Sequence, residues 1–152
     1  MKKRIIYVFG NPLLDFDSLP IKLVPKLRKK FPRINFVIAD PNENLKPEKG
    51  KLYIIDTMKV VSGQWSVVSE NKIQVIEDLD KILLDKIYSA HDFDLGFNLK
   101  LLQKIGELKW VVIFGVPNEM NEEDALIQLV ESIKKCHSEP RRRRVSKNLP
   151  CF

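Results

Sequence analysis

Acidic residues and a histidine recur in this sequence immediately after apolar runs. The segment FGNPLLDFDSLP leaves the run RIIYVF through Gly10 and Asn11, and it carries two aspartates before a stretch with helical spacing. Similar acids close the runs INFVIAD and KLYIID, and a histidine stands in SAHDFD before another helical stripe. The residues at these strand and loop ends are Asp15, Asp17, Asp40, Asp56, His91, Asp92 and Asp94. Carboxylates and imidazole are the side chains of acid-base chemistry and of metal binding.

The elements that would position these residues alternate along the chain. Short continuous apolar runs at 4–9, 34–40, 51–56 and 109–117 predict buried strands. Leucine stripes predict helices over 17–31 and 95–105, and a helix with acids first and lysines last is predicted over 121–136. A hairpin of two further strands is expected within 64–78. This alternation predicts a three-layer α/β/α sandwich with a mostly parallel, twisted central sheet.

One domain over residues 1–138 accounts for the body of the chain. The segment 139–152, which contains four consecutive arginines, is expected to be a flexible basic tail. It carries five basic side chains against one acid, whereas the other residues carry 21 against 19. The net charge of +6 is therefore mostly a property of the tail, and we expect no nucleic-acid partner.

Several classes of function lack their sequence signals. The chain has no glycine-rich phosphate-binding motif and no Gly-x-Ser-x-Gly elbow for a serine nucleophile. No apolar run is long enough for a membrane span, and the amino-terminal run is too short for a signal peptide, so a cytoplasmic protein without a membrane partner is expected. Its two cysteines, Cys136 and Cys151, are expected to be free thiols.

The carboxyl ends of strands in an open α/β sheet lie at one edge, where sites of this architecture form. Taken singly, Asp17 is an ordinary helix cap, Asp40 a turn former and His91 an exposed loop residue. Together, two carboxylates and one imidazole from three loops would suit a divalent metal such as zinc or nickel with positions open to a substrate. The same set would also serve acid-base chemistry without a metal.

Four segments in order resemble the hydrogenase maturation endopeptidases. They are GNPLLDFD after the first strand, YIIDT in the middle, SAHDFDLGFNLKLL before a helix and WVVIFGVP before the last helix. These enzymes remove the C-terminal extension from the large subunit of nickel-iron hydrogenases once nickel is in place, and their fold is a three-layer α/β/α sandwich.

The resemblance implies roles for particular residues. Asp17, Asp56 and His91 fall on the family's metal-binding and catalytic positions, and Gly10, Asn11 and Asp40 would contact the substrate. The metal would be nickel carried by the substrate, and the partner would be the immature large subunit of a nickel-iron hydrogenase. An activated water is then the expected attacking group.

Two other classes of function remain open at the level of the sequence. One is a small-ligand or nucleotide-binding module that uses the Gly10-Asn11 turn at a helix start. The other is a scaffold that binds the hydrogenase subunit without cutting it. An anionic ligand of the first class would be repelled by the carboxylates at the same edge of the sheet. For the second class, only a cleavage assay separates a scaffold from an enzyme.

Overall fold

The computed structural model describes residues 3–14, 18–39, 45–58, 72–77 and 92–138, and it has the predicted α/β architecture. Its strands are β1 (Arg4–Val8), β2 (Ile34–Ile38), β3 (Lys51–Met58), β4 (Gln74–Ile76) and β5 (Trp110–Pro117). Its helices are α1 (Leu19–Lys30), α3 (Asp92–Lys104) and α4 (Glu122–Ser138).

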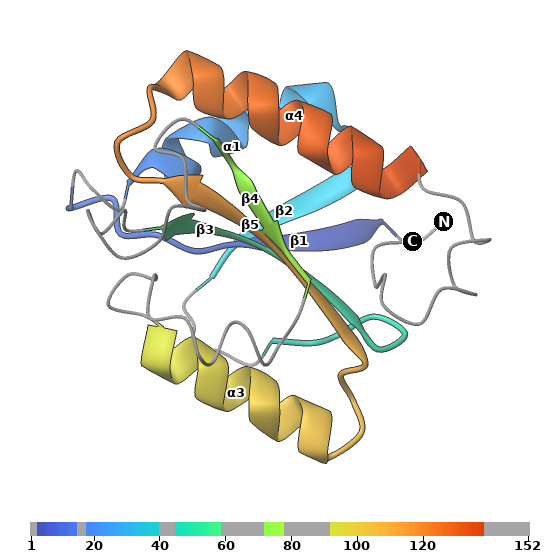
Figure 1. Ribbon diagram of the computed structural model, residues 1–152. Coiled ribbons are helices and arrows are strands. Elements are labelled where there is room, and N and C mark those ends of the chain that lie inside the picture. The colour runs from blue at the N-terminus through green and yellow to red at the C-terminus, as the bar shows by residue number, and fades with distance from the viewer. Residues whose placement is uncertain (1–2, 15–17, 40–44, 59–71, 78–91, 139–152) are drawn as a thin grey trace.

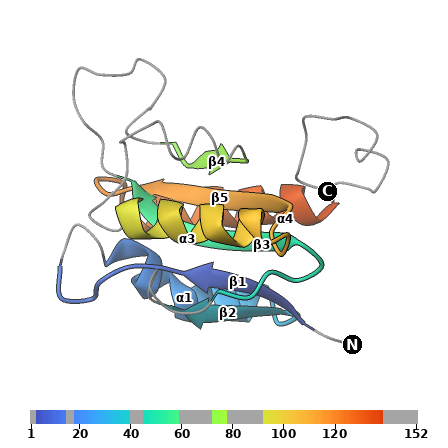
Figure 2. The ribbon, with the colours of Figure 1, turned by 90° about the horizontal axis from the view of Figure 1, so that it is seen from below.

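The five strands form one sheet in the order β2-β1-β3-β5-β4. β2, β1, β3 and β5 are parallel, and only β4 runs antiparallel to its neighbour β5. Helices α1 and α4 cover one face of the sheet and α3 covers the other (Figures 1 and 2). The three layers of the predicted sandwich are therefore confirmed, together with its mostly parallel sheet.

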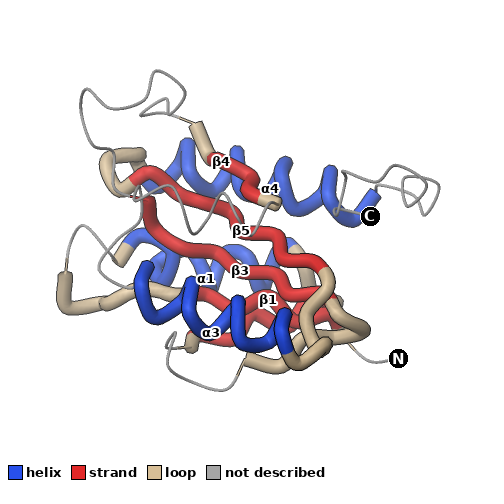
Figure 3. Tube along the Cα trace, turned by 60° about the horizontal axis from the view of Figure 1, so that its bottom comes forward, coloured by secondary structure: helices blue, strands red, loops and turns tan. Residues whose placement is uncertain are grey.

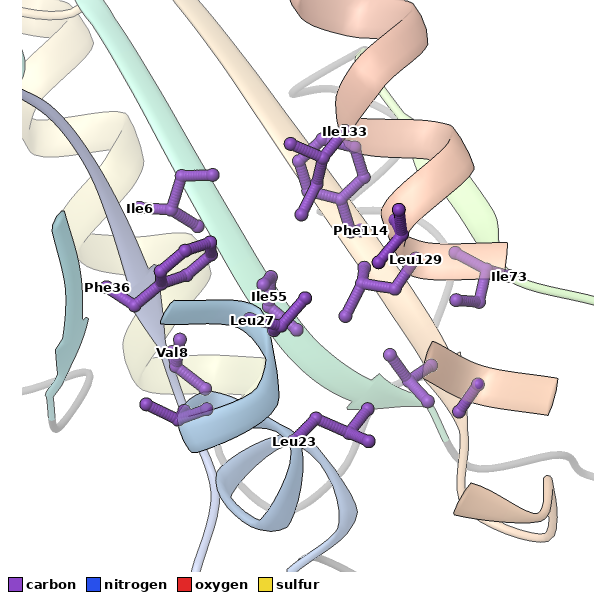
Figure 4. Packing of buried hydrophobic residues seen from close by; sticks show 14 of the residues in the cluster. Ile6, Val8, Leu23, Leu27, Phe36, Ile55, Ile73, Phe114, Leu129 and Ile133 are labelled. Atoms are coloured by element: carbon purple, nitrogen blue, oxygen red, sulfur yellow. The ribbon is translucent and has the colours of Figure 1, made fainter. Parts of the chain in front are cut away.

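Each face of the sheet carries its own hydrophobic core. Toward α1 and α4, buried side chains of both helices pack on alternate residues of the strands (Figure 4). Toward α3, the buried set includes Leu52, Ile54 and Met58 of β3 together with Leu99. Side chains of a strand alternate between faces, so even-numbered residues of β3 point toward α3 and odd-numbered ones toward α1 and α4.

Several boundaries differ from the sequence-based expectation. β3 continues two residues beyond Asp56 to Met58, since its pairing with β5 runs along the whole strand. α3 begins at Asp92, which was expected in a loop, while Ile105 lies beyond the helix end and is exposed. Ser18 precedes α1 without a capping hydrogen bond from its side chain. Helix α1 continues through Pro25 to Lys30.

The cysteine expectation is wrong for Cys136. This residue is buried near the end of α4 and is disulfide-bonded rather than a free thiol. Cys151 lies outside the described residues. The cytoplasmic location, which the thiol expectation supported, stays a prediction.

Other expectations fall on parts of the chain that the structure does not describe. These are the first strand of the hairpin within 64–78 and the tail 139–152. In the described part of the chain, no helix is both long and apolar enough to cross a membrane.

Candidate active site at the carboxyl edge of the sheet

The strand order reverses direction between β1 and β3. The chain leaves β1 through α1 to reach β2 on one side, and it then crosses back to β3 on the other side of β1. The backbone N–H of Phe9 donates to the carbonyl oxygen of Ile55 at 2.9 Å, so the two strands stay in contact at their carboxyl ends. In open α/β sheets this reversal is where a ligand cleft forms.

Asp56 lies directly at this reversal. It follows Ile55 in β3, faces Gly115 of β5 in the sheet register and has no exposed surface. Its Oδ1 accepts a hydrogen bond from the backbone N–H of Thr57 at 2.8 Å. Burying a carboxylate costs several kcal/mol unless hydrogen bonds or a cation offset the lost hydration (roughly 2–7 kcal/mol for a polar group alone). A fully buried carboxylate beside the strand reversal is therefore a candidate functional residue.

The neighbouring residue Gly115 explains how Asp56 and Met58 share one face. A Cβ at Gly115 would lie 2.5 Å from Sδ of Met58, so the glycine leaves the space that this methionine occupies. The Met58 side chain thereby covers Gly115, the β5 residue that pairs with Asp56, on the face toward α3. The local packing thus depends on the absence of a side chain at position 115.

The loop after β1 is held by an Asx turn. Oδ1 of Asn11 accepts from the backbone N–H of Leu13 at 2.9 Å, and the Asn11 carbonyl accepts from Leu14 N at 3.1 Å. The turn presents Leu13 to solvent with 89% of its surface exposed, and Leu14 is exposed as well. Asn11 therefore stabilises this turn, and the apolar tip formed by Leu13 and Leu14 is exposed just beyond the carboxyl end of β1.

The starts of two helices lie at the same end of the sheet as Asp56. α1 begins just after Ser18 and α3 begins at Asp92, and both helices run antiparallel to β1 and β3 (Figures 1 and 3). Asp17 and His91 directly precede these described residues in the chain. Both residues lie outside the described part of the chain, so their position at this edge stays a prediction.

Two polar side chains at this edge were missed by the sequence reasoning. Oγ1 of Thr57 and Oδ1 of Asn118 are buried, and neither has a hydrogen-bond partner among the described residues. Asn118 follows β5, and its backbone N–H donates to the Met58 carbonyl at 2.9 Å. The strand-end rule that selected Asp56 would have selected Asn118 if it had been applied to the run WVVIFGVP.

Comparison with known proteins supports this reading of the architecture. No family model and no curated protein matches the sequence. The maturating endopeptidase HybD of Escherichia coli matches with a TM-score of 0.58 at 19% identity, over 87% of this chain and 93% of that one. A hydrogenase 2 maturation peptidase from a Thaumarchaeota archaeon matches with a TM-score of 0.51 at 17% identity, over 89% and 98% of the two chains.

A third match is the solution structure of an endopeptidase from Escherichia coli. Its TM-score is 0.53 at 17% identity, and 94% of each chain is covered. The chain has the fold of the hydrogenase maturation endopeptidases. At identities of this size the likeness establishes the fold, over nearly the whole length of the known structures.

Within this hydrogenase maturation endopeptidase fold, the predicted site residues divide into two groups. Gly10, Asn11 and Asp56 are described, and all three belong to the carboxyl ends of β1 and β3. Asp17, Asp40 and His91 lie outside the described residues. Among the side chains that the structure does describe, no three metal-ligating residues are grouped so as to hold an ion.

Proposed function

We propose that this protein is an endopeptidase that removes the C-terminal extension of a nickel-iron hydrogenase large-subunit precursor after nickel insertion. The observation that carries the proposal is the fully buried Asp56 at the strand reversal of a hydrogenase maturation endopeptidase fold. The ordered segments GNPLLDFD, YIIDT and SAHDFDLGFNLKLL add sequence support of their own.

In this proposal, nickel is part of the substrate and Asp56 is one of the groups that sense it. The oxygen of a carboxylate suits a divalent cation, and a cation would offset the cost of keeping this carboxylate buried. The bond from Thr57 N–H to Oδ1 fixes the orientation of the carboxylate, as partners of metal-binding groups do. Asp17 and His91 would supply the other carboxylate and the imidazole.

Peptide hydrolysis then needs a positioned water and a held substrate. The carboxylates would orient the attacking water and accept its proton, and the metal of a loaded substrate would supply Lewis acidity at the scissile region. The buried Oδ1 of Asn118 is an acceptor at the same edge that a substrate backbone N–H would satisfy. The apolar tip formed by Leu13 and Leu14 would contact the precursor, with Gly10, Asn11 and Asp40 lining its path.

A cleavage assay tests the proposal directly. The purified protein is incubated with a precursor subunit that carries nickel and with the same precursor lacking nickel, and the products are weighed by mass spectrometry. Loss of a C-terminal fragment from the nickel-loaded precursor alone is the expected result. Stable binding without any loss of mass would favour the scaffold alternative and would contradict the proposed enzyme.

A further inference from the structure

A cavity lies at the opposite end of the sheet from Asp56. Its volume is about 750 Å³, within the range of roughly 300–1,000 Å³ typical of ligand sites. It is lined by Arg4, Lys30, Phe31, Pro32, Arg33, Ile34, Lys134 and His137. Arg4 and Ile34 are the first residues of β1 and β2, so this is the amino edge of the sheet. We call it the amino-edge pocket.

The amino-edge pocket is strongly cationic. Four of the eight lining residues carry a positive charge, and none of the eight is acidic. Lys30 ends α1, Arg33 lies in the turn to β2, and Lys134 belongs to the last turns of α4. An anion that enters the pocket would be attracted by these cations from separate elements.

Two uncharged side chains, those of His137 and Tyr53, contact Arg4 in this pocket. Its Nη1 donates a hydrogen bond to Nδ1 of His137, and its guanidinium lies 5.2 Å from the centre of the Tyr53 ring. In the described part of the chain, no carboxylate pairs with Arg4. Burial raises the pKa of Tyr53, although the charge of Arg4 lowers it. The charge of Glu77, which is outside the pocket lining, adds to the rise. The phenol is therefore neutral and offers no countercharge.

His137 adds a neutral donor beside this charge. Burial and, secondarily, the charge of Arg4 lower the pKa of His137 to about 4, so the ring is neutral at physiological pH. Because Nδ1 accepts from Arg4, the ring proton is on Nε2. That Nε2 is buried and has no hydrogen-bond partner among the described residues. An acceptor oxygen from outside would satisfy it.

We propose that the amino-edge pocket binds an acidic peptide segment. A carboxylate of the segment would accept hydrogen bonds from Arg4 and from Nε2–H of His137, while an adjacent apolar side chain would pack on Phe31, Pro32 and Ile34. Flanking acidic residues would pair with Lys30, Arg33 and Lys134. Arginine suits this task because its planar guanidinium matches the geometry of a carboxylate.

The surroundings favour a carboxylate peptide over a phosphate-rich ligand such as a nucleic acid. The pocket lies at the C-terminal ends of α1 and α4, which offer none of the free N–H groups by which helix N-termini bind phosphate. The three apolar lining residues also suit an aliphatic or aromatic side chain of a peptide.

The pocket is independent of the proposed peptidase site. Arg4 at the start of β1 lies level with Lys51 in the sheet register, and Asp56 follows Lys51 by five residues, which separates the two sites by about 17 Å at ~3.3 Å per residue. The inference therefore does not rest on the proposed function, and its test uses binding alone. Failure of one proposal leaves the other unaffected.

Fluorescence anisotropy of a labelled peptide made of glutamates and leucines tests this inference on the full-length protein. The double variant Arg33→Gln/Lys134→Gln should weaken peptide binding about tenfold, since it removes two exposed cations of the pocket. The matched control Lys100→Gln/Lys104→Gln removes the same charge from exposed positions on α3 and should change binding less than about twofold. Arg4→Lys keeps the positive charge but loses the planar guanidinium that matches a carboxylate, so it should also weaken peptide binding.

Two results would overturn the inference. Equal weakening in the pocket variant and in its control would show that the peptide senses only net charge. Tighter binding of a labelled oligonucleotide than of the peptide, lost in the pocket variant, would assign the pocket to nucleic acid. A peptide of glutamines and leucines should bind far more weakly than the acidic one, which checks that carboxylates are what the pocket recognises.

Discussion

At the scale of a single residue, replacing Asp17 with asparagine separates metal binding from helix capping. Asparagine caps a helix about as well as aspartate but binds a divalent metal poorly. We predict that Asp17→Asn abolishes cleavage of the nickel-loaded precursor and leaves the thermal midpoint unchanged or slightly raised. Asp15→Asn is the matched control and should retain activity. Full activity of Asp17→Asn, measured by precursor mass, would contradict a role of this residue in the site.

The buried oxygen of Asn118 gives a second prediction at this scale. Asn118→Ala removes an acceptor that has no partner among the described residues, so the free energy of unfolding should fall by less than about 1 kcal/mol. Cleavage should nevertheless slow by about tenfold if that oxygen holds the substrate backbone. The exposed Asn35→Ala on β2 is the control and should leave the cleavage rate unchanged. An unchanged rate in Asn118→Ala would remove this residue from the site.

His137 predicts a pH dependence of stability. Its pKa is about 4 in the folded protein, lowered by burial and then by Arg4, against an ordinary value of 6.5. Between these values the unfolded chain takes up a proton that the folded chain does not, so stability is full above pH 6.5 and is lost as the pH falls toward 4. Below about 4 both states are protonated, and this loss stops.

Thermal unfolding at pH 7.5 and pH 4.5 measures this loss. The midpoint of the wild-type protein should fall by several degrees more than that of His137→Gln, since roughly 2–4 °C correspond to 1 kcal/mol in a chain of this size. Equal falls in both proteins would mean that the imidazole contributes nothing to the acid sensitivity.

The sequence allowed Asp56 to be predicted because an acid next to an apolar run is conspicuous. Its complete burial was not predictable, since it depends on the pairing of Asp56 with Gly115, a residue far away in the chain. The hydrogen bond between Arg4 and His137 joins residues 133 positions apart and left no local signal. Contacts between distant elements are set by the assembled fold, not by neighbours in the sequence.

At the scale of the elements, the pairing of β3 with β5 depends on Gly115. Gly115→Ala would place a Cβ 2.5 Å from Sδ of Met58 and should destabilise the protein by about 1–3 kcal/mol through overpacking. Combining it with Met58→Ala should recover at least about 0.5 kcal/mol relative to the sum of the single changes. Urea unfolding of the four proteins measures this coupling, and strictly additive effects would contradict the described contact.

Strands and helices with strong periodicity were predictable, and their ends were not. The runs RIIYVF and WVVIFGVP became β1 and β5, and the acids and lysines of the last predicted helix mark α4. The residues Thr57 and Met58 joined β3 because β5 offered partners to them, which composition does not reveal. The cap of α4 depends on residues that are close in the sequence, since Asn121 Oδ1 accepts a hydrogen bond from Asp124 N–H at 2.8 Å.

At the scale of the whole molecule, the two ends of the sheet differ in charge and in task. The carboxyl edge buries Asp56, and α4 begins there with Glu122, Glu123 and Asp124. The amino edge gathers the cations of the amino-edge pocket. The sheet order β2-β1-β3-β5-β4 puts the strand reversal between β1 and β3, and the candidate active site lies at the carboxyl edge of these two strands.

The central claim is that Asp56 takes part in cutting a nickel-loaded hydrogenase precursor, and one measurement tests it most directly. The mass of the large subunit is followed after mixing the precursor with the wild-type protein or with Asp56→Asn, which keeps the size of the side chain and an oxygen that accepts from Thr57 N–H. The account predicts loss of the C-terminal fragment with the wild-type protein and an intact precursor with a folded Asp56→Asn. Equal cleavage by both proteins would contradict it.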